Sequence, residues 1–156
     1  MAPLPNAQTP PTPGSTPRVR RILLATDLAP ASAGAARQAI ELAQNLGAEL
    51  LIVSVIDPAV SGMRAGRVER MDQRRDAREA TAHELVLLGR QVGVNSSFLV
   101  WEGEPGPAIV EAAAAEQVDM VVVGTRGRSR VERMVLGSVS DHVVRHAGCP
   151  VLIVRS

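Results

Sequence analysis

The sequence predicts a doubly wound α/β domain, in which a five-stranded parallel sheet of order 3-2-1-4-5 carries helices on both of its faces. Two observations lead to this fold. Five short apolar runs are typical of strands buried on both faces, and the segments between them repeat apolar residues at helical spacing. Because strands that alternate with helices pair in parallel through right-handed crossovers, helices have to cover both sides of the sheet.

The expected elements alternate along the chain. The strands are expected at 21–26, 49–57, 96–103, 118–123 and 150–154, and the helices at 31–47, 66–91, 107–117 and 138–147. The first helix should turn one stripe toward the sheet, formed by Ala36, Ala39, Ile40, Ala43 and Leu46. Gly47 is placed to end that helix. The long second helix should bury a face that includes Ala77, Ala80, Leu85 and Leu88.

The composition excludes several classes of mechanism. All 17 basic residues are arginine, so the chain lacks the lysine that a Schiff base or a Walker-type phosphate loop requires. Phe98 and Trp101 are the only Phe, Tyr or Trp residues, and the net charge is +1, so no nucleic-acid partner is expected. The single cysteine, Cys149, has no partner for an internal disulfide.

Residues 1–18 differ in composition from the rest of the chain. Six prolines among small polar residues cannot bury enough apolar area to offset chain ordering, so a disordered tail is expected before a domain at 19–156. The segment lacks the apolar core of a secretory signal, and no run approaches the ~20 apolar residues of a membrane span. A soluble, cytoplasmic protein with no membrane partner is therefore expected.

The stretch after the fourth expected strand has the character of a phosphate-binding loop. Gly124 ends the strand, Gly127 follows after two residues, and Gly137 and Ser138 follow after nine more. Ser138 can cap the next helix, whose free N–H groups suit an anion, and glycines let a phosphate approach the backbone closely. If the first strand lies beside the fourth, Asp27 reaches the same crevice, at the switch point of the sheet.

Several stretches of the chain resemble a known family. They are ATD at 25–27, VSVIDP at 53–58, GEPGPAIVEAA at 103–113, DMVVVGTRGRS at 119–129 and LGSVSDHVVRHAGCPVLIVR at 136–155. Together they resemble the universal stress protein family over about residues 20–155, which implies a Rossmann-like fold. The spacing of the three glycines and Ser138 is similar, at every position, to the ATP-binding signature of that family.

The resemblance implies a set of contacts with ATP. Asp27 would hydrogen-bond the ribose, the backbone of Val55 would meet adenine, and Gly124 would lie near the ribose. The positions implied around the phosphates are Gly127, Gly137, Ser138, Val139 and Ser140. Arg128 lies among them and could neutralise a triphosphate, although a solvated loop explains Arg126, Arg128, Arg130 and Arg133 equally well. Ser54 stands where many relatives have histidine, with little expected effect on ATP.

The function that the resemblance implies is that of an ATP-binding stress protein. ATP would be held with or without Mg²⁺, and its presence would regulate conformation or the choice of a protein partner. Two alternatives stay open, a slow Mg²⁺-dependent ATP hydrolase and an interaction module that binds ATP incidentally. No catalytic residue that would orient an attacking water is identified, so at most slow ATPase activity is expected. The family forms homodimers through its last strand, and the uncovered edge at 149–156 predicts the same here.

Two further clusters have simpler explanations. Six arginines between Arg64 and Arg78 interleave with acidic residues at helical spacing, which indicates an ion-paired, exposed helix face. His142, His146 and Cys149 form an H-x3-H-x2-C string that lacks the glutamate of a zinc-binding helix, so no metal site is predicted. Cys149 also lacks a second thiol and an activating base, and is expected to be buried and inert.

Overall fold

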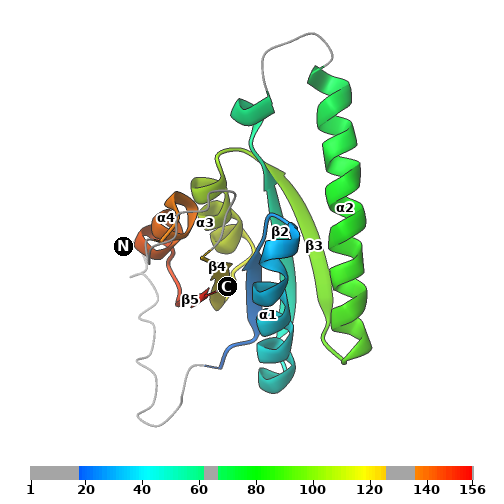
Figure 1. Cartoon of the computed structure of the whole chain (residues 1–156). Helices are drawn as coiled ribbons and strands as arrows, with labels where there is room; N and C mark the ends of the chain where they lie inside the picture. Colours follow the sequence, from blue (N-terminus) through cyan, green and yellow to red (C-terminus); the bar gives the residue numbers. More distant parts are fainter. Residues whose placement is uncertain (1–17, 62–66, 126–135, 156) are drawn as a thin grey trace, which may run out of the picture.

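The computed structural model describes residues 18–61, 67–125 and 136–155, and these residues contain the predicted sheet (Figure 1). Five strands pair in parallel in the order β3-β2-β1-β4-β5. Their bounds are Arg21–Ala25 for β1, Glu49–Ile56 for β2, Ser96–Glu102 for β3, Met120–Gly124 for β4 and Val151–Val154 for β5. The predicted fold class and strand order are confirmed.

The α-helices of the described ranges cover the sheet in two pairs. Their bounds are Ala33–Leu46 for α1, Arg67–Gln91 for α2, Pro105–Ala115 for α3 and Ser138–His146 for α4. α1 and α2 pack on one face of the sheet, and α3 and α4 pack on the other (Figure 1). Within these ranges, none of the helices combines the length and the apolar character that crossing a membrane requires.

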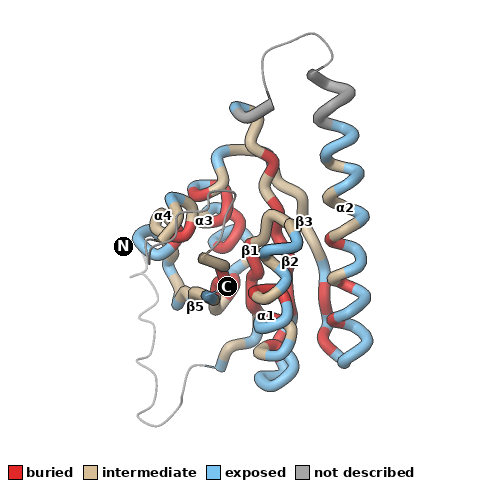
Figure 2. The backbone as a smooth tube through the Cα atoms, in the orientation of Figure 1, coloured by how far each residue is buried: buried red, intermediate tan, exposed pale blue. Residues whose placement is uncertain are grey.

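The central strand, β1, is buried almost completely between the two helical layers (Figure 2). Ile22 and Leu24 point to the face of α1 and α2, whereas Leu23 and Ala25 point to the face of α3 and α4. Successive side chains of a strand alternate between faces, so a strand that is covered on both sides must be apolar at every position. For this reason β1 shows no alternation of polar and apolar residues.

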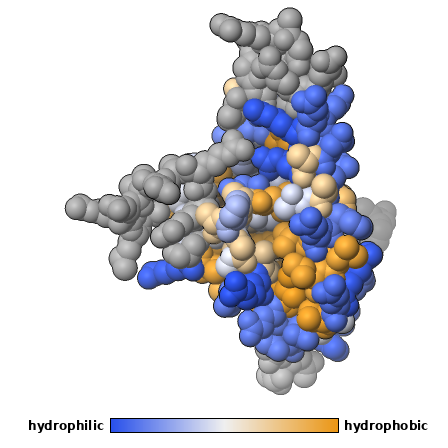
Figure 3. Space-filling view, turned by 45° about the vertical axis from the view of Figure 1, so that its right-hand side comes forward, coloured by the Kyte–Doolittle hydropathy of each residue, from blue (hydrophilic) through white to orange (hydrophobic). Residues whose placement is uncertain are grey.

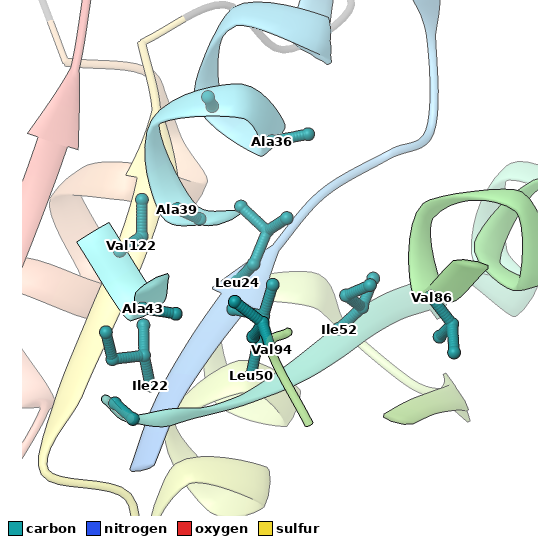
Figure 4. Packing of buried hydrophobic residues seen from close by; sticks show 12 residues of the cluster. Ile22, Leu24, Ala36, Ala39, Ala43, Leu50, Ile52, Val86, Val94 and Val122 are labelled. Carbon is teal, nitrogen blue, oxygen red and sulfur yellow. The ribbon is translucent and has the colours of Figure 1, made fainter. Parts of the chain in front are cut away.

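α1 packs against the sheet through small side chains. Ala36, Ala39 and Ala43 are buried, which lets the helix backbone approach the strands closely (Figure 4). Gly47 ends the helix as predicted, because it adopts a left-handed φ of 63° that a side chain would disfavour. Leu46, which the spacing places in the buried stripe, is instead 41% exposed. It lies about 60° around the helix axis from Ala43 and therefore falls at the margin of the stripe.

The buried face of α2 differs from the prediction. Ala82 and Val86 are buried against the sheet, and Leu85 is half-buried. Three residues that the sequence predicts to point inward are exposed, namely Ala77, Ala80 and Leu88. The apolar residues of α2 are distributed around the helix, so their spacing alone does not define which side meets the sheet. That side was decided by contacts with β2 and β3.

Two arginines of α2 make those contacts. Arg78 donates a hydrogen bond to the hydroxyl of Ser54 in β2, and that serine is only 1% exposed. Arg75 reaches β3, where it donates to the carbonyl of Val100 (3.5 Å) and forms an ion pair with Glu102. Arg75 is ion-paired, as predicted, but its partner lies in β3, and Arg78 is directed to a buried hydroxyl of β2 rather than to the exposed face that the sequence predicts. An arginine stem can cover apolar surface while its head reaches a polar partner.

The contact between α3 and α4 depends on a glycine. A Cβ atom at Gly106 would lie 2.9 Å from both Cβ and Cγ of His142, which is closer than real side-chain contacts. We expect Gly106→Ala to force the two helices apart and to lower the free energy of unfolding by about 1–3 kcal/mol. Urea denaturation of the purified variant measures this change.

Gly34→Ala in the first turn of α1 is the matched control for that variant. A Cβ atom at Gly34 meets nothing within 4 Å. Because alanine favours the helix and restricts the unfolded chain, this change should stabilise the protein by up to about 1 kcal/mol. Equal effects of the two substitutions would contradict the close packing of α3 on α4.

Candidate functional site

The candidate site lies at the carboxyl ends of β1 and β4. These strands are neighbours in the sheet, yet the chain leaves β1 toward α1 on one face and enters α4 on the other face after β4. The winding direction therefore reverses between them, which opens a crevice beyond the two strand ends. The predicted switch point is in this position, and the residues that follow β1 and β4 line it.

Asp27 follows β1 by two residues and is held by the start of α1. Its Oδ1 atom accepts a hydrogen bond from the Ser32 hydroxyl (2.6 Å) and another from the Ala29 N–H (2.9 Å). Thr26 forms a similar turn, because its hydroxyl accepts from the N–H of Leu28 (3.0 Å). Among the described residues Oδ2 of Asp27 accepts no hydrogen bond. The carboxylate is thus oriented by one oxygen, and the other is available for a ligand.

Val55 offers its backbone rather than its side chain. The carbonyl of Val53 accepts a hydrogen bond from Thr26, just past β1, so the backbone groups of Val53 face β1 (3.0 Å). Alternate residues of a strand turn their N–H and C=O groups to the same side, and those of Val55 therefore face the same way. The pairing of β1 with β2 ends at Ala25 and Val53. The backbone of Val55 consequently faces the space beyond the end of β1.

The end of β4 and the beginning of α4 are joined by direct contacts. The hydroxyl of Ser140 donates to the carbonyl of Gly124 (3.0 Å), and Ser140 is 5% exposed. A Cβ atom at Gly124 would lie 3.5 Å from the Cβ of Ala35 in α1, and one at Gly137 would lie 4.0 Å from the carbonyl oxygen of Thr125. These distances place the end of β4 between the first turns of α1 and α4.

The N-terminus of α4 differs in one detail from the prediction. Gly137, not Ser138, occupies the N-cap position, and no side chain caps the helix. Ser138 is the first helical residue and is exposed. The prediction that Ser138 caps α4 is therefore wrong, because the helix begins one residue earlier than that role requires. The first backbone bond of the helix runs from Asp141 to Gly137 (2.9 Å), which leaves the preceding N–H groups outside the helical ladder.

The described residues bring together seven of the predicted positions. Around the crevice lie Asp27, Val55, Gly124, Gly137, Ser138, Val139 and Ser140. Gly127 and Arg128 fall in 126–135, outside the described residues, as do Arg126, Arg130 and Arg133. Ser140 takes a different role from the predicted one, because its hydroxyl is engaged by Gly124 and only its N–H group can point to a ligand.

Neither glycine of the described part of this site is needed by the fold. Gly124 and Gly137 have no left-handed φ, and a Cβ atom at either position would make only ordinary van der Waals contacts. Gly106 and Gly47, by comparison, are required by packing and by a positive φ respectively. What the two site glycines provide is therefore open space in front of the backbone at the crevice.

Sequence reasoning missed the residues that support the site. Ser32 fixes Asp27 by a hydrogen bond, and Ala35 leaves room for the end of β4. The spacing of Asp27 and Ser32 across the start of a helix is a signal for the first contact. Nothing in the sequence marks Ala35, because it differs from the other alanines of α1 only through its neighbour in β4.

The two histidines of the H-x3-H-x2-C string lie against each other on α4. The rings of His142 and His146 stack on each other with centroids 4.1 Å apart, and Nδ1 of His146 bonds to the carbonyl of His142 (2.8 Å). Across the part of the chain that the structure describes, no group of three or more metal-binding side chains occurs. Cys149 is half-buried, and burial, followed by the charge of Asp119, raises the pKa of its thiol above the ordinary value. A raised pKa keeps the thiol protonated and unreactive.

Comparison with known proteins identifies the family of this chain. The model of the universal stress protein family matches residues 18–155. The chain belongs to the universal stress protein family. A universal stress protein of Thermus aquaticus is 37% identical over 138 residues, which cover 87% of this chain and 98% of the relative. The solved universal stress protein UspA of Lactobacillus plantarum has a TM-score of 0.81 at 24% identity, over 90% of this chain and all of that one.

Some solved members of the family contain adenine nucleotides. One was crystallised in complex with cAMP, and it matches with a TM-score of 0.68 and 25% identity over 88% of this chain and 98% of that chain. The universal stress protein of Archaeoglobus fulgidus contains dAMP (TM-score 0.66, 23% identity, 87% and 98% covered). A member from Arabidopsis thaliana contains AMP (TM-score 0.66, 20% identity, 87% and 91% covered).

Proposed function

We propose that this universal stress protein binds ATP in the crevice between β1 and β4 and that ATP regulates its conformation or its choice of a protein partner. The observation that carries the proposal is that Gly124 and Gly137 are glycines without a structural need, at a strand end and a helix start. Glycines in such places allow a phosphate to approach the backbone. The adenine nucleotides in other members of the family support the same ligand class.

The proposal assigns each part of ATP to a group of described residues. The backbone of Val55 faces the space beyond β1 and can pair with the edge of adenine. The Oδ2 atom of Asp27 can accept a hydrogen bond from a ribose hydroxyl. The N–H groups at the start of α4, together with the exposed hydroxyl of Ser138, can hold phosphate oxygens. Gly127 and Arg128 complete the proposed phosphate site.

Magnesium has a smaller part in this proposal. Asp27 is the carboxylate that the described residues bring to the crevice, and one of its oxygens is engaged by Ser32 and Ala29. A single half-engaged carboxylate is a weak metal site, so Mg²⁺ would arrive with the phosphates of ATP. The protein would then contribute the hydroxyl of Ser138 rather than a preformed metal cage.

Regulation by ATP is favoured over rapid hydrolysis. A hydrolase needs a group that orients the attacking water, and Asp27 is already committed to Ser32 and Ala29 through Oδ1. Glu102, at the end of β3, is paired with Arg75. We expect slow turnover at most. Repeated turnovers with Mg²⁺ that are lost in Asp27→Asn would favour the hydrolase instead.

The base specificity of the site tests the proposed function directly. Protein purified under native conditions and analysed by native mass spectrometry should carry an adenine nucleotide. The backbone N–H and C=O groups of Val55 present a donor and an acceptor in a fixed order. The guanine edge carries its donor and acceptor in the opposite order to the adenine edge. In isothermal titration calorimetry ATP should therefore bind more tightly than GTP. Absence of a bound nucleotide together with no heat of ATP binding would overturn the proposal.

A second copy of the same chain is also a proposed partner, and the two copies would form a homodimer by pairing their β5 strands. Within the described residues β5 pairs only with β4, and its other edge is uncovered. The carbonyls of Pro150 and Val154 bond toward β4, so alternation turns the backbone groups of Val151 and Ile153 outward. Leu152 is 39% exposed beside that edge. An open apolar edge of this kind favours strand pairing between two chains.

A further inference from the structure

An apolar groove runs between α1 and α2, on the opposite face of the sheet from α4. Its volume is about 470 Å³, and its apolar walls are formed by Ile40 of α1 and by Leu85, Leu88 and Val92 at and just past the end of α2. Leu88 is 51% exposed and Val92 is 42% exposed, although both are large aliphatic side chains. A hydrophobic area of this kind, surrounded by polar residues, is visible on this side of the molecule (Figure 3).

The groove continues toward the place where the described chain begins. A second hollow of about 220 Å³ shares Gln44 and Val92 with the groove and extends to Glu49 at the start of β2. The N–H of Glu49 donates to the carbonyl of Arg20 (2.8 Å), so the start of the described chain lies beside this hollow. The N–H of Arg20 is held in turn by the carboxylate of Asp119 (2.8 Å). The described chain thus begins within reach of this hollow, but its first residues run toward Asp119 beside β4, so a segment that precedes Arg18 has to turn back across the start of β1 to reach the groove (Figure 1).

We propose that residues 1–17 of the same chain bind in this groove. Along α1 the groove extends from Ala33 to Gln44, a distance of about 17 Å at the rise of an α-helix. Seventeen residues in the polyproline conformation span about 50 Å, which is enough to cross the second hollow and to fill the groove. Because the tail is attached beside its site, even weak contacts are sufficient for occupancy.

The chemistry of the tail matches that of the groove. Residues 1–17 contain six prolines, Leu4 and no charged side chain, and they can bury apolar surface without desolvating a charge. The polar groups that line the groove include Arg37 and Gln91, whose N–H groups can donate to carbonyl oxygens of an extended segment. A proline-rich segment presents such carbonyls and has few N–H groups of its own to satisfy. This recognition is independent of the nucleotide crevice.

A paramagnetic label on the tail tests the proposal. Cys149→Ser removes the native thiol, and Ala7→Cys then provides one site for a nitroxide label. With methyl-labelled full-length protein and no added nucleotide, we expect a strong loss of signal at Ile40, Leu85, Leu88 and Val92. The methyl groups of Val143 and Val144 in α4, on the opposite face of the sheet, should keep their intensity. Equal intensities on both sides would overturn the proposal.

Two leucines that are adjacent in α2 provide a matched pair of variants. Leu88 lines the groove, whereas Leu87 lies outside it with a similar exposure of 45%. In the nitroxide-labelled protein, Leu88→Asn should release the tail and restore the methyl signals of Ile40 and Val92. Leu87→Asn should leave the tail in place, so the nitroxide should still weaken these signals. No difference between the variants would contradict docking in the groove.

A mixture of labelled and unlabelled chains identifies the occupant. The nitroxide is placed on chains without isotope, and the methyl groups are observed on chains without the nitroxide. We expect no loss of signal in this mixture, because the tail belongs to the same molecule. Loss of signal would show that the groove takes a tail or a surface of a second copy, and the proposal of binding within one chain would fail.

Discussion

Gly137→Val should weaken the binding of ATP by about 100-fold, or about 2.8 kcal/mol. Gly137 precedes the first residue of α4, and the isopropyl group of valine would occupy the space that a phosphate needs in front of the helix N-terminus. The backbone at this position, with φ −59° and ψ 159°, suits any residue, and a Cβ atom would lie 4.0 Å from Thr125. The variant should therefore fold normally. Isothermal titration calorimetry with ATP measures the loss.

Gly148→Val is the matched control for this prediction. Gly148 follows α4 at its other end and is exposed, and a Cβ atom at this position would meet nothing within 4 Å. ATP affinity should be unchanged in this variant, and circular dichroism should show the same helical content in both. If Gly137→Val retained the affinity of the parent chain, the assignment of the phosphates to the start of α4 would be wrong. The double change Gly127→Val with Gly137→Val extends the same test to residue 127.

Leu152→Arg should convert a dimeric chain into a monomer. Leu152 is 39% exposed beside the open edge of β5, and a charge at an edge strand opposes pairing with another chain. Light scattering coupled to size-exclusion chromatography at micromolar concentration should give the dimer mass for the parent chain and half of that mass for the variant. The effect is all-or-none, because the proposed interface contains one short strand from each chain.

Leu87→Arg controls for the general effect of a new surface charge. Leu87 is 45% exposed on α2, at the other edge of the sheet from β5. This variant should keep the mass of the parent chain. A monomeric parent chain at the same concentration would disprove the dimer, and a dimeric Leu152→Arg variant would move the interface away from β5.

The strands and their order could be predicted because each rests on a local signal. β1, β2 and β4 are apolar runs that only a two-sided burial explains, and the confirmed order β3-β2-β1-β4-β5 accounts for the meeting of Asp27 and Gly124. The same local signals failed for α2. Its apolar side chains lie all around the helix, and the sheet selected the side that presents Arg75 and Arg78 to β3 and Ser54.

The sequence predicted that Asp27 and Gly124 lie at the switch point, but it could not predict the contacts of the individual residues, and the binding of ATP by these residues stays a prediction. The glycine spacing identified Gly124 and Gly137. It could not show that the hydroxyl of Ser140 donates a hydrogen bond to the carbonyl of Gly124, or that Ser138 is the first residue of the helix. A helix can begin one residue earlier or later without a change in its pattern. The cap position depends on how α4 meets the end of β4, which is a tertiary contact.

The sequence by itself determined the parallel sheet, the helices between its strands and the position of the switch point, because these follow from hydrophobic periodicity and from glycine and proline positions along the chain. Only the tertiary structure decided which side of α2 is buried, which oxygen of Asp27 stays available and that the groove beside Leu88 lies open. These features depend on contacts between segments that are distant in the chain. Such contacts do not produce a periodic pattern of apolar residues in either segment, so they cannot be predicted from one segment alone.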